Sequence, residues 1–266
     1  MCRYFFLAIL WLSYCLTPLI VFAGPAEEPY EALRGRVAAE FAGRTPHEWG
    51  ETVTGVRTRL KSHDKVLALT LDACGSAHGK GFDNALITFL EKERIPATLF
   101  INARWIDANP GLFARLAANP LFEIANHGFA HRPASVSGRS VYGISGTRDV
   151  RELVDEIERN ARKIAGLTSV RPRYYRSGTA YYDEVAVEVS RRLGHEVIGF
   201  SILGDAGATY RKEQVRAALL KSGPGDIVIA HMNHPEGETA AGLMAAIPEL
   251  ERRGFRFVRL SDYELR

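Results

Sequence analysis

Two histidines, His127 and His131, stand four residues apart in the segment His127-Gly-Phe-Ala-His131. Imidazoles at this spacing can face the same way across one helical turn and bind a single metal ion. A hydrolytic zinc site takes about three protein ligands and leaves one position for water, and a carboxylate such as Asp72 would suit the third place. The residues therefore predict a divalent-metal site at His127, His131 and Asp72, although this spacing of histidines is also common by chance.

Other polar side chains come directly after segments that have the composition of buried strands. They are, in chain order, Asp72, Asn126, His127, His131, Arg176, Asp205 and His231. In parallel α/β folds the reactive groups collect beyond the carboxyl ends of the strands. A strand-end aspartate alone is often a cap, and a loop histidine alone is usually just solvated. The prediction of a site depends on the convergence of these residues on one rim.

The elements that position these residues alternate along the chain. Apolar runs predict seven strands, at residues 66–71, 97–101, 121–125, 173–175, 196–202, 227–230 and 255–260. Helices are predicted at residues 31–42, 82–94, 110–118, 150–164, 185–193, 211–221 and 240–252. The helix at 150–164 has the clearest i, i+3, i+4, i+7 spacing. Strands that alternate with helices predict an α/β fold with a parallel sheet, open or closed, and no linker divides it into two domains.

Several function classes are excluded by what the 266 residues lack. The glycine-rich loop Gly75-Ser-Ala-His-Gly79-Lys80-Gly81 has three residues before Gly-Lys where a P-loop has four, and Gly81 replaces the Ser or Thr, so no nucleotide site is expected. No Gly-x-Ser-x-Gly elbow offers a serine nucleophile. The 34 basic and 31 acidic residues are interspersed and give a formal charge of +3, so nucleic acid is not expected as a partner.

The N-terminus has the pattern of a targeting segment. Residues 4–22 are almost wholly apolar, follow Arg3 and end in Val21-Phe22-Ala23, with small residues at the −3 and −1 positions. We therefore expect residues 1–23 to be a signal peptide, and the protein to be exported to the periplasm or secreted. Because roughly 18–20 apolar residues can span a bilayer, an uncleaved membrane anchor is the alternative. Cleavage would leave Cys74 as the single cysteine, without an internal disulfide.

Residues 66–263 resemble the polysaccharide deacetylase family, carbohydrate esterase family 4, which includes the chitin and peptidoglycan deacetylases. Five ordered segments carry the resemblance: Leu69-Thr-Leu-Asp72, Pro96-Ala-Thr-Leu-Phe100, Ile124-Ala-Asn-His-Gly-Phe-Ala-His131, Arg173-Tyr-Tyr-Arg-Ser-Gly178 and Asp226-Ile-Val-Ile-Ala-His231. The resemblance implies a distorted (β/α) barrel with about seven parallel strands in one domain. Residues 64–266 would form this catalytic domain, and residues 24–63 an N-terminal extension that packs on the barrel.

The resemblance also implies a chemistry, the hydrolysis of an N-acetyl group with the help of a divalent ion, usually Zn²⁺. Asp72 would be the general base that takes a proton from water, and His231 the general acid that gives one to the leaving amine. Arg176 would keep Asp72 ionised and oriented. His127 and His131 would bind the metal.

The first motif departs from the family pattern, because Ala73 stands where the family has its second aspartate, a metal ligand. Asp72 would then bind the metal itself, or Cys74 or His78 would substitute, or the ion would be held weakly. Strand alternation could point Cys74 away from the site. A further alternative is that the metal is lost. The third motif also differs, with Ser177-Gly178 in place of the usual Pro-Pro.

From these residues we predict an exported, metal-dependent hydrolase that removes N-acetyl groups from amino sugars of a polysaccharide or oligosaccharide. The expected partner is an N-acetylated glycan of peptidoglycan or chitin type. The alternative is a non-catalytic glycan-binding protein on the same fold, which Ala73 supports and the retained Asp72, Arg176 and His231 oppose. Tyr181 and Tyr182 would shape a sugar subsite or pack in the core, and residues 136–147 would be a substrate-shaping loop or a surface excursion.

Overall fold

The computed structural model describes Met1 and residues 28–266, so the predicted signal peptide lies, Met1 apart, outside the described residues. The helices are α1 Tyr30–Glu40, α2 Asn84–Lys92, α3 Ala103–Ala108, α4 Pro110–Ala118, α5 Val150–Thr168, α6 Glu184–Arg192, α7 Lys212–Leu219, α8 Thr239–Arg252 and the 3-10 turn η1 Leu260–Asp262. The strands are β1 Val66–Ala73, β2 Ala97–Ile101, β3 Phe122–Asn126, β4 Ser140–Val141, β5 Ile144–Ser145, β6 Tyr174–Tyr175, β7 Glu196–Val197, β8 Ile202–Leu203, β9 Asp226–His231 and β10 Arg256–Val258. Among these described helices, none combines the length and the hydropathy needed to cross a bilayer.

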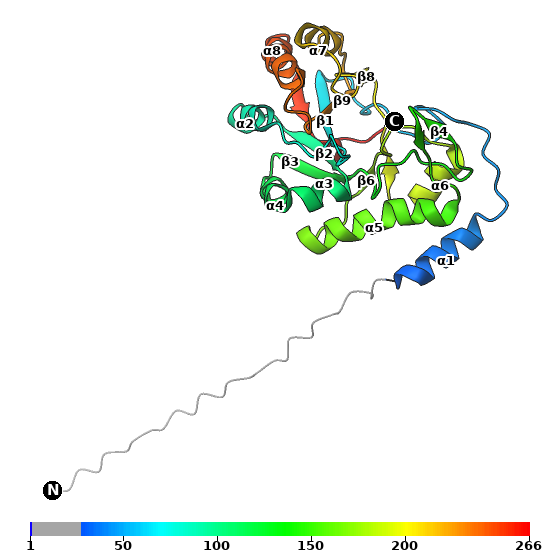
Figure 1. Ribbon diagram of the computed structural model, residues 1–266. Helices are drawn as coiled ribbons and strands as arrows, with labels where there is room; N and C mark the ends of the chain where they lie inside the picture. The colour runs from blue at the N-terminus through cyan, green and yellow to red at the C-terminus, as the bar shows by residue number, and fades with distance from the viewer. Residues whose placement is uncertain (2–27) are drawn as a thin grey trace.

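The main sheet is parallel and follows the order β7-β6-β3-β2-β1-β9-β8. An eighth strand, β10, pairs with β1 at residues 66–68, and β2 pairs with β1 beyond it, at residues 70–73. Figure 1 shows the helices around the outside of this curled sheet. The predicted α/β class and the barrel-like parallel sheet in one domain are confirmed.

The sheet is curled because its two edge strands, β7 and β8, are only four residues apart in the chain. The sequence predicted one strand over residues 196–202, and this prediction was wrong. Ile198 still donates to the carbonyl of Tyr175 on β6 (2.9 Å), whereas Ser201 already donates to the carbonyl of Ile227 on β9 (3.0 Å). The segment 198–201 thus crosses the seam of the barrel from one edge of the sheet to the other.

Strand β1 divides its side chains between two apolar regions with the strand period of two. Leu67, Leu69, Leu71 and Ala73 point outward into a core shared with α2, α4, α7 and α8. Val66 and Ala68 point into the barrel, as do Thr70 and Asp72, whose side chains lie beside the buried Arg176. The interior of the barrel is therefore apolar at the bottom and polar at the carboxyl ends of the strands.

The described residues before β1 are tied to the barrel at several points. Helix α1 lies beside α5 (Figure 1), where the guanidinium of Arg34 forms an ion pair with Asp155 at 2.7 Å. Farther along, Gly50 forms a bridge with Tyr182 and Arg57 with Ile198 at the seam. These contacts place residues of the N-terminal extension next to the rim of the sheet.

One buried histidine outside the rim gives the fold a dependence on pH. His195, between α6 and β7, is 1% exposed, and its burial together with the charge of Arg171 lowers its pKa to about 3. The unfolded chain, with a histidine pKa of about 6.5, binds more protons than the folded chain between pH 3 and 6.5, so stability falls as the pH falls through this window.

We therefore predict that His195 makes the free energy of unfolding about 2 kcal/mol smaller at pH 5 than at pH 7. Denaturant unfolding at the two pH values should show this loss in the parent protein and a smaller loss in His195→Leu. The exposed His63→Leu is the matched control and should keep the parental pH dependence. An equal pH dependence in His195→Leu and the parent would contradict the prediction.

Candidate active site

The predicted site residues meet at the carboxyl ends of the parallel strands. Asp72 and His231 are direct register partners on β1 and β9, His127 follows β3, and Arg176 follows β6. The second carboxylate oxygen of Asp72 lies 3.7 Å from Nε2 of His127. His131 lies beside His127, with 5.0 Å between the ring centroids. The convergence that the sequence predicted is present.

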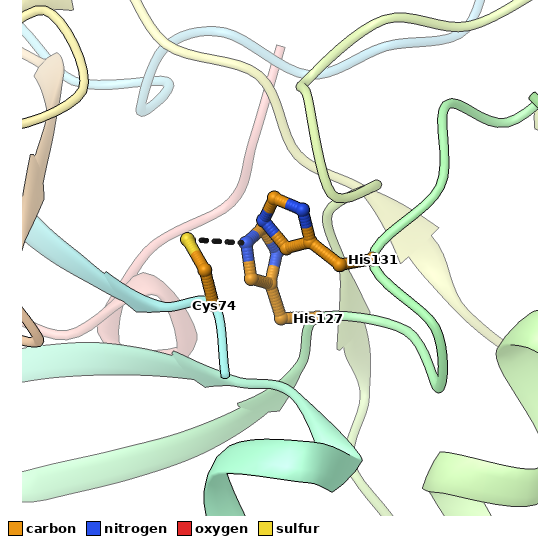
Figure 2. Close-up of side chains that lie close together, drawn as sticks. All are labelled: Cys74, His127 and His131. Atoms are coloured by element: carbon orange, nitrogen blue, oxygen red, sulfur yellow. Dashed lines mark hydrogen bonds between the residues drawn. The ribbon is translucent and has the colours of Figure 1, made fainter. Parts of the chain in front are cut away.

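A group of three possible metal ligands forms the centre of this rim: Cys74, His127 and His131 (Figure 2). Their ligand atoms all lie within 4.8 Å of one another, and Sγ of Cys74 is 3.8 Å from Nε2 of His127. Nε2 of His131 is buried and has no hydrogen-bond partner. A buried nitrogen without a partner is costly unless something else binds it, and a metal ion would do so.

Cys74 reaches this group because residues 72 and 74 lie on the same face of the chain as β1 ends. The expectation that strand alternation could turn it away was wrong: alternation turns Ala73 outward into the apolar core and brings Cys74 back to the face of Asp72. Burial alone raises the pKa of the Cys74 thiol. The imidazoles of His131, His127 and His231 outweigh this effect and lower the pKa of Cys74 well below its usual range, which favours the thiolate.

The structure places the three residues that the sequence offered as the third metal ligand, Asp72, Cys74 and His78. The carboxylate of Asp72 accepts a hydrogen bond from Nη1 of Arg176 at 2.7 Å and lies outside the group of three. His78 is exposed on the loop after β1. Cys74 is the residue that stands with the two histidines, and Asp72 as a metal ligand stays a prediction.

The orientation of His127 is fixed by a backbone acceptor. Its Nδ1 lies 3.0 Å from the carbonyl oxygen of Arg176. Because a carbonyl only accepts, Nδ1 must carry the proton, and the lone pair is left on Nε2, the atom that faces Cys74. An acceptor on the second nitrogen of this kind is the usual support of a metal-binding histidine.

Arg176 is fully buried and makes the contact with Asp72 that the resemblance implied. Its Nη1 donates to Asp72 and, at 2.9 Å, to the hydroxyl of Thr70. Its Nε and Nη2 donate to the carbonyls of Ile198 and Gly199 at 3.2 and 2.8 Å. The guanidinium thus donates hydrogen bonds to two buried backbone carbonyls of the seam and to one carboxylate oxygen of Asp72.

His231 is held by a carboxylate that the sequence placed on the rim without a role. The carboxylate of Asp205 lies 2.9 Å from Nδ1 of His231. It also accepts hydrogen bonds from the backbone N–H of His231 (2.7 Å) and from the hydroxyl of Thr239 (3.0 Å). Burial lowers the pKa of His231, but the charge and hydrogen bond of Asp205 outweigh it and raise the pKa well above the usual range. The raised pKa favours the protonated form of His231, and because Nδ1 is engaged with Asp205, Nε2 is the nitrogen that faces away from this carboxylate.

A second carboxylate, Glu156 of α5, was missed by the sequence analysis. It is 3% exposed and accepts hydrogen bonds from the backbone N–H groups of Ala130 (2.8 Å) and Arg132 (3.1 Å), the two neighbours of His131. His131 itself has a φ of 60°, a conformation that needs such support. The sequence did contain a sign of this role, because Glu156 is a charged residue next to Ile157, within the apolar stripe of the predicted helix.

The loop between His127 and His131 packs closely on Glu156 at Gly128. Gly128 has a φ of 76°, and a Cβ at this position would lie 2.3 Å from a carboxylate oxygen of Glu156. The glycine in His127-Gly-Phe-Ala-His131 is thus required both by its backbone conformation and by the carboxylate that supports the loop.

Comparison with known proteins assigns the family. The model of the polysaccharide deacetylase family matches residues 59–198, more than half of the chain. The chain belongs to the polysaccharide deacetylase family. It is 25% identical to a chitooligosaccharide deacetylase of Bradyrhizobium over 184 residues, 64% of this chain and 78% of the relative. It is 23% identical to a peptidoglycan-N-acetylglucosamine deacetylase of Bacillus cereus over 211 residues, 78% of this chain and 92% of the relative.

Solved structures of this family share the fold. A family 4 carbohydrate esterase pseudoenzyme of Bacillus anthracis superposes with a TM-score of 0.64 at 19% identity, covering 77% of this chain and 67% of that chain. A solved peptidoglycan N-acetylglucosamine deacetylase has the same fold, with a TM-score of 0.65 at 19% identity, covering 78% of this chain and 91% of that chain. Whether this member is active depends on its own site residues.

The support of the histidine loop gives a prediction about metal affinity. Glu156→Gln replaces one carboxylate oxygen with an N–H2 group, which opposes one of the two backbone donors and loosens His131. We expect the affinity for zinc to fall about 10–100-fold, the range typical of residues that orient a ligand. Competition with a chromophoric chelator measures this affinity.

The adjacent Asp155→Asn is the matched control, because Asp155 contacts Arg34 on α1 and not the loop. It should bind zinc as the parent protein does. Parental zinc affinity in Glu156→Gln would show that the loop does not need the carboxylate.

Proposed function

We propose that this protein is an exported, metal-dependent deacetylase that removes N-acetyl groups from amino sugars of a polysaccharide or oligosaccharide. The observation that carries the proposal is the position of Cys74, which lies with His127 and His131 in a group of three possible metal ligands although the family's second aspartate is replaced by Ala73. The printed names of the relatives, which concern chitooligosaccharide and peptidoglycan N-acetylglucosamine, support a glycan of this kind. The apolar segment within residues 1–23 supports export to the periplasm or secretion.

The donor set fits zinc. One thiolate and two imidazole Nε2 atoms are ligands that Zn²⁺ prefers, and three protein ligands leave one position open, as catalytic zinc sites require. Cys74, His127 and His131 would hold the ion. When bound, zinc would polarise the acetyl carbonyl and acidify a water molecule.

The remaining rim residues would divide the proton transfers between them. Asp72 would accept a proton from the attacking water through the oxygen that Arg176 does not hold. His231 would donate the proton on Nε2 to the leaving amine, because its Nδ1 is engaged with Asp205. Acid and base thus come from neighbouring strands, β1 and β9, whose residues 72 and 231 are register partners.

The second candidate is a glycan-binding protein without catalysis. The observation that favours it is Ala73, which is buried in the apolar core and offers no ligand where the family has an aspartate. The two candidates predict opposite results in one assay.

The test is acetate release by the purified protein from peptidoglycan and from N-acetylglucosamine oligomers, with zinc or with a chelator. We expect release that the chelator stops and added zinc restores. No release from any of these glycans, with zinc bound, would refute the deacetylase and leave the binding protein.

A variant separates the proton donor from the metal ligands. His231→Ala should lower acetate release about 10²–10⁴-fold, the usual contribution of a general acid, and leave the zinc content of the protein unchanged. The exposed His78→Ala is the control and should keep both release and zinc. Parental release in His231→Ala would remove it from the mechanism.

A further inference from the structure

Three aromatic side chains from separate parts of the chain form a cluster beside the site: Trp49, Tyr142 and Tyr181. The ring centroids of Trp49 and Tyr181 are 5.8 Å apart, and those of Tyr142 and Tyr181 are 5.6 Å apart in an edge-to-face arrangement. Trp49 belongs to the segment before β1, and Tyr142 stands at the turn between β4 and β5. We call these three residues the aromatic cluster.

The aromatic cluster is exposed, in contrast to the neighbouring Tyr182. Tyr142 is 70% exposed, Trp49 and Tyr181 are partly exposed, and Tyr182 is completely buried in the core. Of the two tyrosines that the sequence offered for a sugar subsite, Tyr181 therefore remains. Adjoining aromatic rings at a protein surface typically mark a binding site.

The backbone at Tyr142 supports a role for its ring. Tyr142 and Gly143 both have positive φ, 53° and 74°, as the central residues of a type I′ hairpin turn do. The first of these positions favours asparagine, aspartate or glycine, and a bulky aromatic residue is disfavoured there. The hairpin thus carries an exposed ring at a position where a smaller residue would be more stable.

The aromatic cluster is joined to the loop of His131. The carbonyl of Tyr181 accepts a hydrogen bond from the backbone of Ala134 at 3.0 Å. Three residues before Tyr181, Gly178 packs so closely on the backbone of His131 that a Cβ would lie 2.3 Å from its carbonyl carbon. The segment that carries Tyr181 is therefore packed against the loop that carries His131, and the aromatic cluster adjoins the ligand group.

Two charged groups lie at the aromatic cluster and have no ion-pair partner within the described residues. The guanidinium of Arg139 is 5.1 Å from the centroid of the Trp49 ring. Glu51 is partly buried, which raises the pKa of its carboxyl group. Burial also raises the pKa of the Tyr142 phenol, and Glu51 lies near enough for its charge to add to that effect. Rings with planar polar side chains at their edges fit a sugar, whose C–H face stacks while its hydroxyl groups form hydrogen bonds.

We propose that Trp49, Tyr142 and Tyr181, with Arg139 and Glu51, form a subsite for a pyranose ring next to the N-acetylated sugar, so that the protein binds oligomers in preference to single sugars. The subsite deepens the proposed function, since it assumes that the glycan is the ligand of this rim. It also assigns a part of the N-terminal extension, residues 49–51, to substrate binding.

The test is binding rather than turnover. Tetra-N-acetylglucosamine is titrated into the metal-free protein without residues 1–23, which removes Trp11, and the fluorescence of Trp49 is followed with calorimetry beside it. Trp105, the other tryptophan of the described residues, is completely buried. We expect Trp49→Ala to weaken binding about tenfold or more, because losing one stacked ring costs about 1.4 kcal/mol. The exposed Leu167→Ala on α5 is the control and should bind like the parent protein.

A second variant separates ligand binding from folding. Tyr142→Asn removes the ring and suits the positive φ, so its unfolding midpoint should be equal to or above that of the parent while its affinity for the tetramer falls. Parental affinity in both Trp49→Ala and Tyr142→Asn would overturn the subsite. Binding that depends on Trp49 in a protein that releases no acetate would uphold the subsite and refute the deacetylase.

Discussion

The buried guanidinium of Arg176 is the group on which the rest of this structure depends. A fully buried cation is stable only when its charge and its N–H groups are satisfied, and Arg176 meets this condition with Asp72, Thr70 and two backbone carbonyls. It also lies over the ring of Phe100, 4.2 Å from its centroid. The same side chain binds the backbone of the seam between β7 and β8 and orients the carboxylate at the end of β1, so one residue links the closure of the barrel to the geometry of the site.

Two imidazoles of the site, those of His127 and His231, are oriented in the same way, by an oxygen acceptor at Nδ1. His127 donates a hydrogen bond from Nδ1–H to the carbonyl of Arg176, and His231 donates one from Nδ1–H to the carboxylate of Asp205. In both cases Nε2 is left to face the centre of the rim. The difference lies in the acceptor: His127 meets a neutral carbonyl, whereas His231 meets the charged Asp205, which outweighs the effect of burial and raises the pKa of His231 well above its usual range. In the proposed mechanism, this difference in acceptor separates the metal-binding His127 from the proton-donating His231.

The sequence predicted most of the scaffold and the rim because both depend on local patterns. Apolar runs located the strands, and Asp72, Arg176 and His231 could be found because each closes such a run. The partners Asp205 and Glu156 could not be assigned, since each meets its histidine only through the pairing of β8 with β9 or the packing of α5 on the loop. Cys74 was left open because its direction depends on where β1 ends. The prediction of one strand over residues 196–202 was wrong because this segment crosses from one edge of the sheet to the other, and the position of the edges depends on the whole sheet.

In the proposed zinc site the thiolate of Cys74 takes the place of the carboxylate that is missing at Ala73. X-ray absorption at the zinc edge of the zinc-loaded protein tests this directly. We expect one sulfur ligand at about 2.3 Å with two nitrogen ligands at about 2.0–2.1 Å, and loss of the sulfur shell in Cys74→Ala. A first shell of nitrogen and oxygen alone in the parent protein would contradict it.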